Sequence, residues 1–279
     1  MPTPPRHATQ RPRDDAQTGL YADAMIYDIL HTPGTAQELD ALERIAARHV
    51  RPPAPTTHWL EPACGSARCV RLAAKRGTPT TGFDLDPGMV AYANSRIERA
   101  GLAGTARALT ADMRTCVDDN AIPRHAFGFA FNTINSFRHL TTDRDALDHL
   151  AQMAHALRPG GVYAVGISTT AYGLEYPSED VWRGARGPVA VTQTVQYIPP
   201  TGKTGGARAE RVLSHLMIER PSGTEHRDST YALRTYSLEQ WLALIARSPF
   251  VIEETTDHDG HPCEPAESGY RVFVLRARS

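Results

Sequence analysis

The sequence predicts an α/β fold in which a doubly wound, mostly parallel sheet carries an antiparallel C-terminal hairpin and an antiparallel β insertion. Between residues 58 and 168, short apolar runs alternate with amphipathic segments of helical length, which is typical of parallel strands joined by helices. Two strand-like runs, 250–256 and 269–277, follow one another without a helix and favour a hairpin. The segment 168–236 combines strand-like runs with Gly-rich turns, which predicts an all-β insertion.

Composition divides the chain into three parts. Residues 1–18 are rich in proline and arginine and contain little to bury, so we expect a disordered tail there. Residues 19–167 and 237–279 are expected to form one ligand-binding α/β domain. The segment 168–236 is expected to interrupt that domain as an antiparallel insertion.

The N-terminal part, residues 20–50, predicts two helices separated by Pro33 and Gly34. Thr35 is expected to be the N-cap of the second helix, because Glu38 follows three residues later as in a capping box. The buried face of this helix is expected to consist of Leu39, Leu42, Ile45, Ala46 and His49.

The remaining elements follow from the same reading of apolar spacing. Strands are expected at 58–65, 79–86, 106–113, 126–133 and 162–168. Helices are expected at 66–77, 87–101, 143–161 and 237–248. In the insertion, three strand-like runs occupy 188–198, 211–220 and 227–236.

Composition also limits the partners of the chain. Its 279 residues carry 30 Lys and Arg against 31 Asp and Glu, a balance that disfavours nucleic acid and anionic membranes as partners. No apolar run approaches the ~18 residues that a membrane-spanning helix needs. The four cysteines form no CxxC pair and the chain starts without an apolar leader, so we expect a cytoplasmic protein.

The first strand-to-helix turn indicates the kind of ligand. In a doubly wound sheet the ligand lies beyond the carboxyl ends of the strands, and small residues let the backbone approach it closely. Here the strand ends in Glu61 and the turn contains Gly65. A carboxylate at this place suits a ligand with an ammonium group and would repel a pyrophosphate.

Two further strand ends extend the pattern. Asp84 ends the second strand about twenty residues after the turn, where a carboxylate can accept hydrogen bonds from two ribose hydroxyls. Asp112 and Met113 end the third strand and suit the amino group and the face of an adenine. A ligand with sugar, amine and base but no phosphate fits these groups, and S-adenosylmethionine meets that description.

The stretches LEPACGSARCVRLAAKRG, TGFDLDPGMVAYA, LTADM and LRPGGVYAVGIS resemble, in this order and spacing, the class I S-adenosylmethionine-dependent methyltransferases. The resemblance covers residues 59–167 and 237–276. It implies a seven-stranded Rossmann-like sheet, S-adenosylmethionine as cofactor and S-adenosylhomocysteine as product. The family pattern ExGxGxG is altered, because Ala63 and Ala67 replace the outer glycines and leave Gly65.

The resemblance also implies a set of cofactor-binding residues. Glu61, Ala63 and Gly65 would line the methionine part of the ligand, and Asn132 would lie near its amino-acid group. Asp84 would hold the ribose. The adenine would be flanked by Leu85 and Met89 and contacted at its edge by Asp112 and Met113.

The N-terminal stretch YADAMIYDILH and the β insertion resemble a narrower group, the amino-sugar N-methyltransferases of natural-product pathways. By this resemblance Tyr27 and His139 are the candidate catalytic residues, and Tyr21 is a candidate to contact the cofactor. An alkyl amine with a pKa near ~10.4 is neutral in only about one part in a thousand at pH 7, so a histidine base would help the transfer. The alternatives are a packing role for His139 and a buried aromatic pair of Tyr21 and Tyr27.

The sequence therefore predicts a methyltransferase that acts on nitrogen or oxygen of a small-molecule acceptor. A nicotinamide-dependent oxidoreductase and a non-catalytic adenosyl-binding module are the alternatives. The insertion is expected to be a substrate lid or a dimer interface, which includes a homodimer among the expected partners. The stretch DHDGHPCE, with Asp257, His258, His261 and Cys263, is interpreted as a solvated loop, and no metal is expected.

Overall fold

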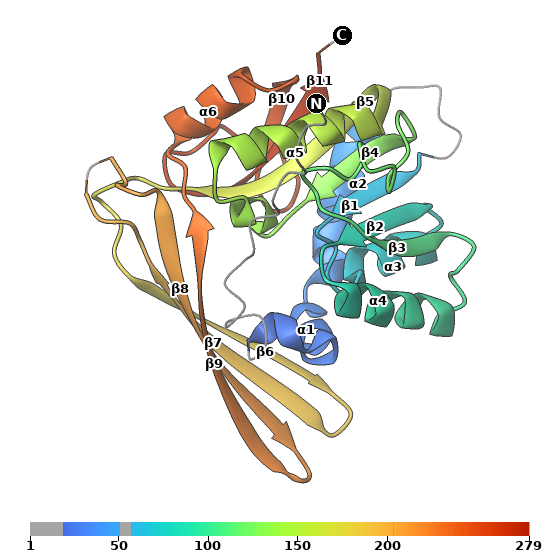
Figure 1. Ribbon diagram of the computed structural model, residues 1–279, viewed down its shortest axis with the longest axis vertical. Helices are drawn as coiled ribbons and strands as arrows, with labels where there is room; N and C mark the ends of the chain where they lie inside the picture. The colour runs from blue at the N-terminus through green and yellow to red at the C-terminus, as the bar shows by residue number, and fades with distance from the viewer. Residues whose placement is uncertain (1–18, 51–56, 203, 279) are drawn as a thin grey trace, which may run out of the picture.

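The computed structural model describes residues 19–50, 57–202 and 204–278 (Figure 1). It confirms the predicted fold class, with one seven-stranded sheet and a separate antiparallel sheet of four strands. The predicted disordered tail, residues 1–18, lies outside the described residues.

The seven-stranded sheet has the order β10-β11-β5-β4-β1-β2-β3. Its strands are β1 (Trp59–Pro62), β2 (Thr80–Asp84), β3 (Ala106–Thr110), β4 (Phe127–Asn132), β5 (Leu157–Thr169), β10 (Phe250–Thr256) and β11 (Gly269–Ala277). The five strands from β3 to β5 are parallel, whereas β11 is antiparallel to both β5 and β10. The predicted C-terminal hairpin is thus present.

Strand β11 lies inside the sheet, between β5 and β10, although it follows both in sequence. Residues 272–275 of β11 are buried without interruption, a pattern typical of a strand covered on both faces. Strand β10 alternates buried and more exposed positions and leaves Val251 at the surface. This difference places β11 in the interior and β10 at the edge.

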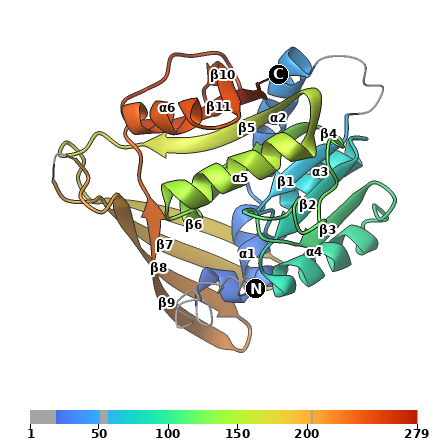
Figure 2. The ribbon, with the colours of Figure 1, turned by 45° about the horizontal axis from the view of Figure 1, so that its top comes forward.

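Helices cover both faces of this sheet (Figure 2). One face packs against α2 (Thr35–His49), α3 (Arg68–Lys75) and α4 (Pro87–Arg99). The other packs against α5 (Asp143–Ala156) and α6 (Leu238–Ala246), where the largest apolar cluster of the chain lies. In the described ranges, no helix is both long and apolar enough to cross a lipid bilayer.

Several helix boundaries differ from the sequence-based expectation, and two of the differences have a clear physical reason. Gly34 is the N-cap of α2 with a φ of 82°, and Thr35 is the first helical residue, with its hydroxyl donating to the carbonyl of Thr32. Glycine adopts this left-handed conformation easily, so the cap moves one residue back. Helix α5 ends at Ala156 and not near residue 161, because Pro159 disfavours a helical conformation in the residue before it.

The insertion forms a four-stranded antiparallel sheet in the order β6-β7-β8-β9. Its strands are β6 (Ser178–Arg186), β7 (Val189–Ile198), β8 (Ala209–Arg220) and β9 (Gly223–Arg234). The sequence predicted only three of them. Strand β6 was missed because its residues are polar or exposed along nearly their whole length and show no apolar alternation.

The N-terminal segment contains the short 3-10 helix η1 (Leu20–Ala22) and the helix α1 (Ala24–His31). Helix α1 lies between the four-stranded sheet and the α/β domain (Figure 1). Its N-cap is Asp23, whose carboxylate accepts hydrogen bonds from the amides of Met25 and Ile26, each 3.2 Å long. Its apolar face packs against the sheet through Ile26, Ile29, Leu30, Val191, Leu216 and Ile218.

Candidate active site

The turn between β1 and α3 adopts an unusual backbone conformation. Ala63, Gly65 and Ala67 have φ values of 52°, 53° and 58°, in the left-handed region that favours glycine. The two alanines therefore keep the turn conformation that the glycines of the family pattern would adopt. An L-residue there costs about 1–2 kcal/mol relative to the right-handed conformation.

This strain predicts that Ala63→Gly raises the free energy of unfolding by about 0.5 kcal/mol. The relief of the left-handed strain, about 1–2 kcal/mol, exceeds the added chain entropy of glycine, about 0.5–1 kcal/mol. Urea titration measures the change. Ala74→Gly, in the regular helix α3, is the control and is expected to lower the free energy of unfolding by about 1 kcal/mol. Equal losses in the two variants would contradict the assignment of strain to Ala63.

The ring of Tyr27 lies directly over the turn. A Cβ atom placed on Gly65 would stand 2.8 Å from Cε1 of Tyr27, closer than real contacts allow. Gly65 is therefore required by this close approach as well as by its φ. The predicted catalytic residue Tyr27 and the predicted turn residue Gly65 thus lie in contact, although they come from α1 and the loop after β1.

Glu61 and Asn132 end neighbouring strands and present unpaired acceptor atoms. Within the described part of the chain, neither Oε2 of Glu61 nor Oδ1 of Asn132 has a hydrogen-bond donor, although both atoms are buried. The Asn132 side chain is fixed by its Nδ2, which donates to the carbonyl of Pro62 at 2.9 Å. Burial raises the pKa of Glu61 to about 8, although nearby Arg68 acts in the opposite direction. Two buried acceptors without a donor indicate a ligand that brings donors of its own.

Arg68, the first residue of α3, supplies a positive charge to the same place. Its side chain is nearly buried and pairs with Glu38 at 2.5 Å, while it also donates to the hydroxyl of Thr35 at 3.1 Å. Sequence reasoning missed Arg68. Its position directly after the turn was the available signal, since the first residues of this helix face the ligand side.

Tyr27, Glu61, Arg68 and Asn132 all line one small cavity. It is lined by Tyr27, Glu61, Pro62, Ala63, Cys64, Arg68, Asn132, Thr133, Ile134 and Ser136. A second hollow lies beside it, between the N-terminal segment and the start of α4. That hollow is lined by Tyr21, Ala22, Asp23, Ala24, Met25, Asp86, Gly88, Met89 and Tyr92.

Asp84 links the end of β2 to the turn. Its Oδ2 accepts a hydrogen bond from the amide of Gly65 at 2.8 Å, and its Oδ1 accepts one from the amide of Asp86 at 3.0 Å. Burial raises the pKa of Asp84 above its ordinary value, although these two amides act in the opposite direction. A carboxylate offers about four lone-pair sites, so the group keeps acceptor capacity for a ligand hydroxyl.

The residues predicted around an adenine have different environments. Leu85 is 42% exposed, whereas Met89 is buried at the start of α4. The carboxylate of Asp112 is held by Arg114 through close contacts, of which the shortest is 2.6 Å. Met113 is partly buried against the main apolar cluster, and its carbonyl oxygen lies 3.0 Å from Nδ1 of His149.

An aromatic cluster lies beside the cavity. Nε2 of His139, from the 3-10 helix η2 (Ser136–His139), lies 3.3 Å from the hydroxyl of Tyr21. The His139 ring stacks on Tyr231 of β9, with centroids 5.8 Å apart and an angle of 22° between the planes. Tyr21 in turn lies 5.8 Å from the ring of Tyr27. The predicted residues Tyr21, Tyr27 and His139 are thus brought together, and the sequence missed Tyr231.

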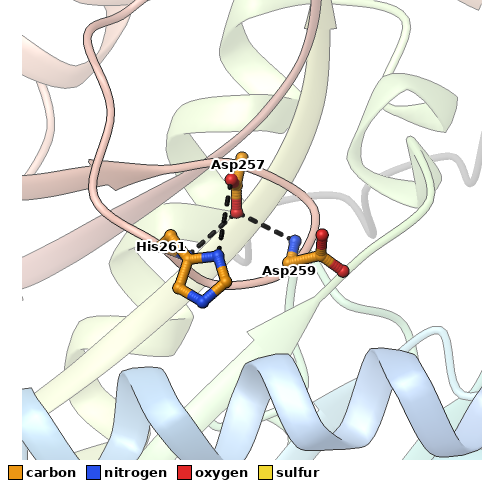
Figure 3. Close-up of side chains that lie close together, drawn as sticks. All are labelled: Asp257, Asp259 and His261. Carbon is orange, nitrogen blue, oxygen red and sulfur yellow. Dashed lines mark hydrogen bonds and ion pairs between the residues drawn. The ribbon is translucent and has the colours of Figure 1, made fainter.

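The loop between β10 and β11 contains the acidic and histidine residues that resembled a metal site. Asp257 accepts hydrogen bonds from the amides of Asp259 and His261, at 3.0 and 2.9 Å (Figure 3). Asp259 and His261 are exposed, and α2 holds the loop because Arg44 donates to the carbonyl of Asp259 at 2.6 Å. These contacts make a turn docked on α2, in which possible ligand atoms of Asp257, Asp259 and His261 lie within 4.8 Å of one another, and the absence of a metal stays a prediction.

Comparison with known proteins finds similarity to methyltransferases in part of the α/β domain. Residues 60–161 match a family model described as a methyltransferase domain. An ATP synthase lysine N-methyltransferase of Mus musculus is 33% identical over 81 residues, which are 29% of this chain and 30% of that protein. The chain thus matches less than a third of the length of this curated relative.

Two solved structures share the whole architecture. An S-adenosylmethionine-dependent methyltransferase from Clostridium acetobutylicum is 14% identical with a TM-score of 0.70, covering 92% of this chain and 98% of its own. The sugar N-methyltransferase KedS8 from Streptoalloteichus is 19% identical with a TM-score of 0.69, covering 99% of this chain and 100% of its own. At these identities the likeness shows a common fold, including the β insertion.

Proposed function

We propose that the protein methylates a small molecule with S-adenosylmethionine as cofactor, because residues 60–161 match the methyltransferase-domain model and the chain shares the fold of an S-adenosylmethionine-dependent methyltransferase. The observation that carries the proposal is the buried, unpaired Oε2 of Glu61 beside the left-handed turn. A site with this acceptor requires a ligand that carries a hydrogen-bond donor. An ammonium group satisfies it, whereas a phosphate does not.

The residues present fit the amino-acid end of the cofactor. Oε2 of Glu61 and Oδ1 of Asn132 would accept hydrogen bonds from its ammonium group, and Arg68 would attract its carboxylate. Asp84 would accept hydrogen bonds from the ribose hydroxyls. The adenine is proposed to lie between Leu85 and Met89, with Asp112 and Met113 at its edge. Ala63 and Gly65 would let the backbone approach the methionine part closely.

The chemistry that the chain itself supplies is positioning and proton transfer. When bound, the cofactor supplies an activated methyl group on its sulfonium. Tyr27 and Tyr21 would align the acceptor behind that methyl group, an effect that can lower a barrier by about 7–11 kcal/mol. The proton that the acceptor nitrogen or oxygen loses would reach Nε2 of His139 through the Tyr21 hydroxyl 3.3 Å away, which would accept that proton while it donates its own to Nε2.

The acceptor is proposed to be a small amine or hydroxyl compound such as an amino sugar. Support comes from the four-stranded insertion, which brings Tyr231 to His139, and from its presence in the sugar N-methyltransferase KedS8, which covers 99% of this chain. We propose the insertion as a substrate lid, with its outer face as the surface for a homodimer. A cytoplasmic location is proposed because all four cysteines are free thiols, three of them buried.

Titration calorimetry and mass spectrometry test the proposal together. The protein is titrated with S-adenosylmethionine, S-adenosylhomocysteine and NADH, and a panel of amines, phenols and sugar nucleotides is examined for a methyl-sized gain in mass. Binding of both adenosyl ligands with a methylated product is expected. Binding of NADH alone would favour an oxidoreductase, and adenosyl binding without any product would favour a non-catalytic binding module.

The raised pKa of Glu61 predicts that cofactor binding releases a proton. In the free protein this group, with a pKa of about 8, is mostly protonated at pH 7, whereas a bound ammonium group favours the ionised form and lowers the pKa. Affinity for S-adenosylhomocysteine should therefore rise with pH, by close to ~10-fold per unit between pH 6 and 7. Calorimetry in buffers with different ionisation enthalpies counts the released proton directly.

Glu61→Gln is the control for this prediction, because glutamine has the same shape but no proton to lose. The variant should bind S-adenosylhomocysteine more weakly, and its affinity should change little with pH over the same interval. A proton release that is absent from the wild-type protein, or that persists in Glu61→Gln, would contradict the assignment.

A further inference from the structure

One carboxylate on α1 connects the elements that surround the site. Asp28 is completely buried, and its Oδ1 accepts a hydrogen bond from the hydroxyl of Ser66 at 2.8 Å. Ser66 lies in the strained turn, between Gly65 and Ala67, and is itself buried. Asp28 therefore holds the turn at Ser66, whereas Asp84 holds it at Gly65.

Three other elements reach the same carboxylate. Arg71 of α3 donates to Oδ1 at 2.5 Å, and the hydroxyl of Tyr92 of α4 donates to Oδ2 at 2.9 Å. Arg186, at the end of β6, donates to Oδ2 at 2.7 Å and also to the Tyr92 hydroxyl at 2.9 Å. The side chain of Asp28 thus joins the insertion to the turn between β1 and α3, called the cofactor turn below.

The charges around Asp28 are arranged to keep it ionised. Burial acts to raise its pKa, but Arg71, Ser66 and Arg186 together hold the pKa of this carboxyl below its ordinary value. A buried charge is tolerated only when its partners are in place. Replacement of Arg71 or Arg186 would therefore remove one hydrogen bond to Asp28 and also weaken the contacts that Asp28 makes with its other partners.

The packing of α1 on the insertion leaves little freedom for independent movement. A Cβ atom on Gly184 of β6 would stand 2.2 Å from the carbonyl oxygen of Ile29, so the backbones of β6 and α1 touch. Tyr27, the neighbour of Asp28 in sequence, lies in contact with Gly65 of the turn. A shift of the turn must therefore move α1, and a shift of α1 must move β6.

We infer that Asp28 is a positioning residue that couples the cofactor turn to the β insertion, so that cofactor binding orders the acceptor side of the site. This inference rests on the proposed function. A cofactor bound at the turn restrains Ser66 and Tyr27. Because Asp28 is hydrogen-bonded to both Ser66 and Arg186, the restraint also limits the motion of Arg186 and of the β6–β7 hairpin. Coupling of this kind is reciprocal, so an acceptor bound under the insertion would raise cofactor affinity by the same factor.

Amide hydrogen exchange with S-adenosylhomocysteine as the probe tests the coupling. In the wild-type protein the ligand is expected to slow exchange in residues 59–68 and also in residues 178–198, which do not line the proposed cofactor site. In Arg186→Gln the affinity for the ligand should stay within about threefold, while at least half of the ligand-induced protection of residues 178–198 disappears. Arg186→Lys, which keeps the charge, should restore part of that protection.

Arg227→Gln is the matched control. Arg227 of β9 lies 3.5 Å from Asp23, so it also joins the insertion to the N-terminal segment but does not touch Asp28. This variant should keep the wild-type protection of residues 178–198. Asp28→Asn should lose the protection and bind the ligand about tenfold more weakly.

The outcomes separate the two proposals. Ligand binding without any protection of residues 178–198 in the wild-type protein would overturn the coupling and leave the proposed function standing. Equal loss of protection in Arg186→Gln and Arg227→Gln would also overturn it, because any loosened contact would then suffice. Failure of the wild-type protein to bind S-adenosylhomocysteine would overturn the proposed function and the coupling with it.

Discussion

Asp84→Ala is expected to weaken the binding of S-adenosylmethionine and S-adenosylhomocysteine by at least about 100-fold. The substitution removes the proposed ribose acceptor, and hydrogen bonds to a charged group contribute about 1.5–3 kcal/mol each, so two of them correspond to roughly 10²- to 10⁴-fold. It also removes the bond that fixes the amide of Gly65. Titration calorimetry with S-adenosylhomocysteine measures the loss.

The Asp84→Ala protein is expected to remain folded. The pKa of Asp84 is raised in the folded state, so its ionised form opposes folding at pH values above the ordinary carboxyl pKa. Its removal therefore takes away no favourable charge. Asp84→Asn keeps an acceptor for Gly65 but not the charge, and a smaller loss of about tenfold is expected. Unchanged affinity in Asp84→Ala would contradict the ribose assignment.

His139→Ala is expected to reduce kcat for methyl transfer by about 10²- to 10⁴-fold, the range that a positioned general base contributes. Affinity for S-adenosylhomocysteine should stay within about threefold, because the ammonium, carboxylate and ribose groups of the ligand are proposed to bind Glu61, Arg68 and Asp84. Steady-state kinetics with the acceptor identified by the product screen, together with calorimetry, separates the two quantities.

His31 offers a control histidine close to the same cleft. Its ring lies 4.4 Å from that of Tyr27, and burial lowers the pKa of His31 to about 3, so it stays neutral over the working range. His31→Asn should change kcat only severalfold and leave its pH dependence as in the wild type. An unchanged kcat in His139→Ala would show that this residue has the alternative, packing role.

Local periodicity was enough to predict most of the fold. The alternation of apolar runs and amphipathic segments depends on residues that are close in sequence, so β1 to β5 and their helices could be placed without knowledge of contacts. Strand β6 could not, because it is stabilised by pairing with β7 and by its contact with α1 at Gly184, which leave no pattern in its own residues.

Some residues of the candidate site could likewise be predicted from the sequence, and others could not. Glu61, Asp84 and Asn132 were predictable because the carboxyl ends of parallel strands meet at one edge of a sheet. The side chains that complete the site come from distant segments, as with Tyr231 stacked on His139 or Arg186 paired with Asp28. Asp28 did leave one signal, a carboxylate on the otherwise apolar face of α1, but its partners could not be read from spacing.

The interior position of β11 has a consequence for the order of folding. During synthesis every other strand of the seven-stranded sheet is made before β11, yet β5 and β10 are joined only through it. Until residues 269–277 emerge, β5 offers a row of unpaired backbone groups to any other extended segment. Strands β10 and β11 can pair locally as the C-terminal hairpin, so the central sheet is completed when this hairpin adds to β5 through β11, a non-local step that is slow compared with pairing of adjacent strands.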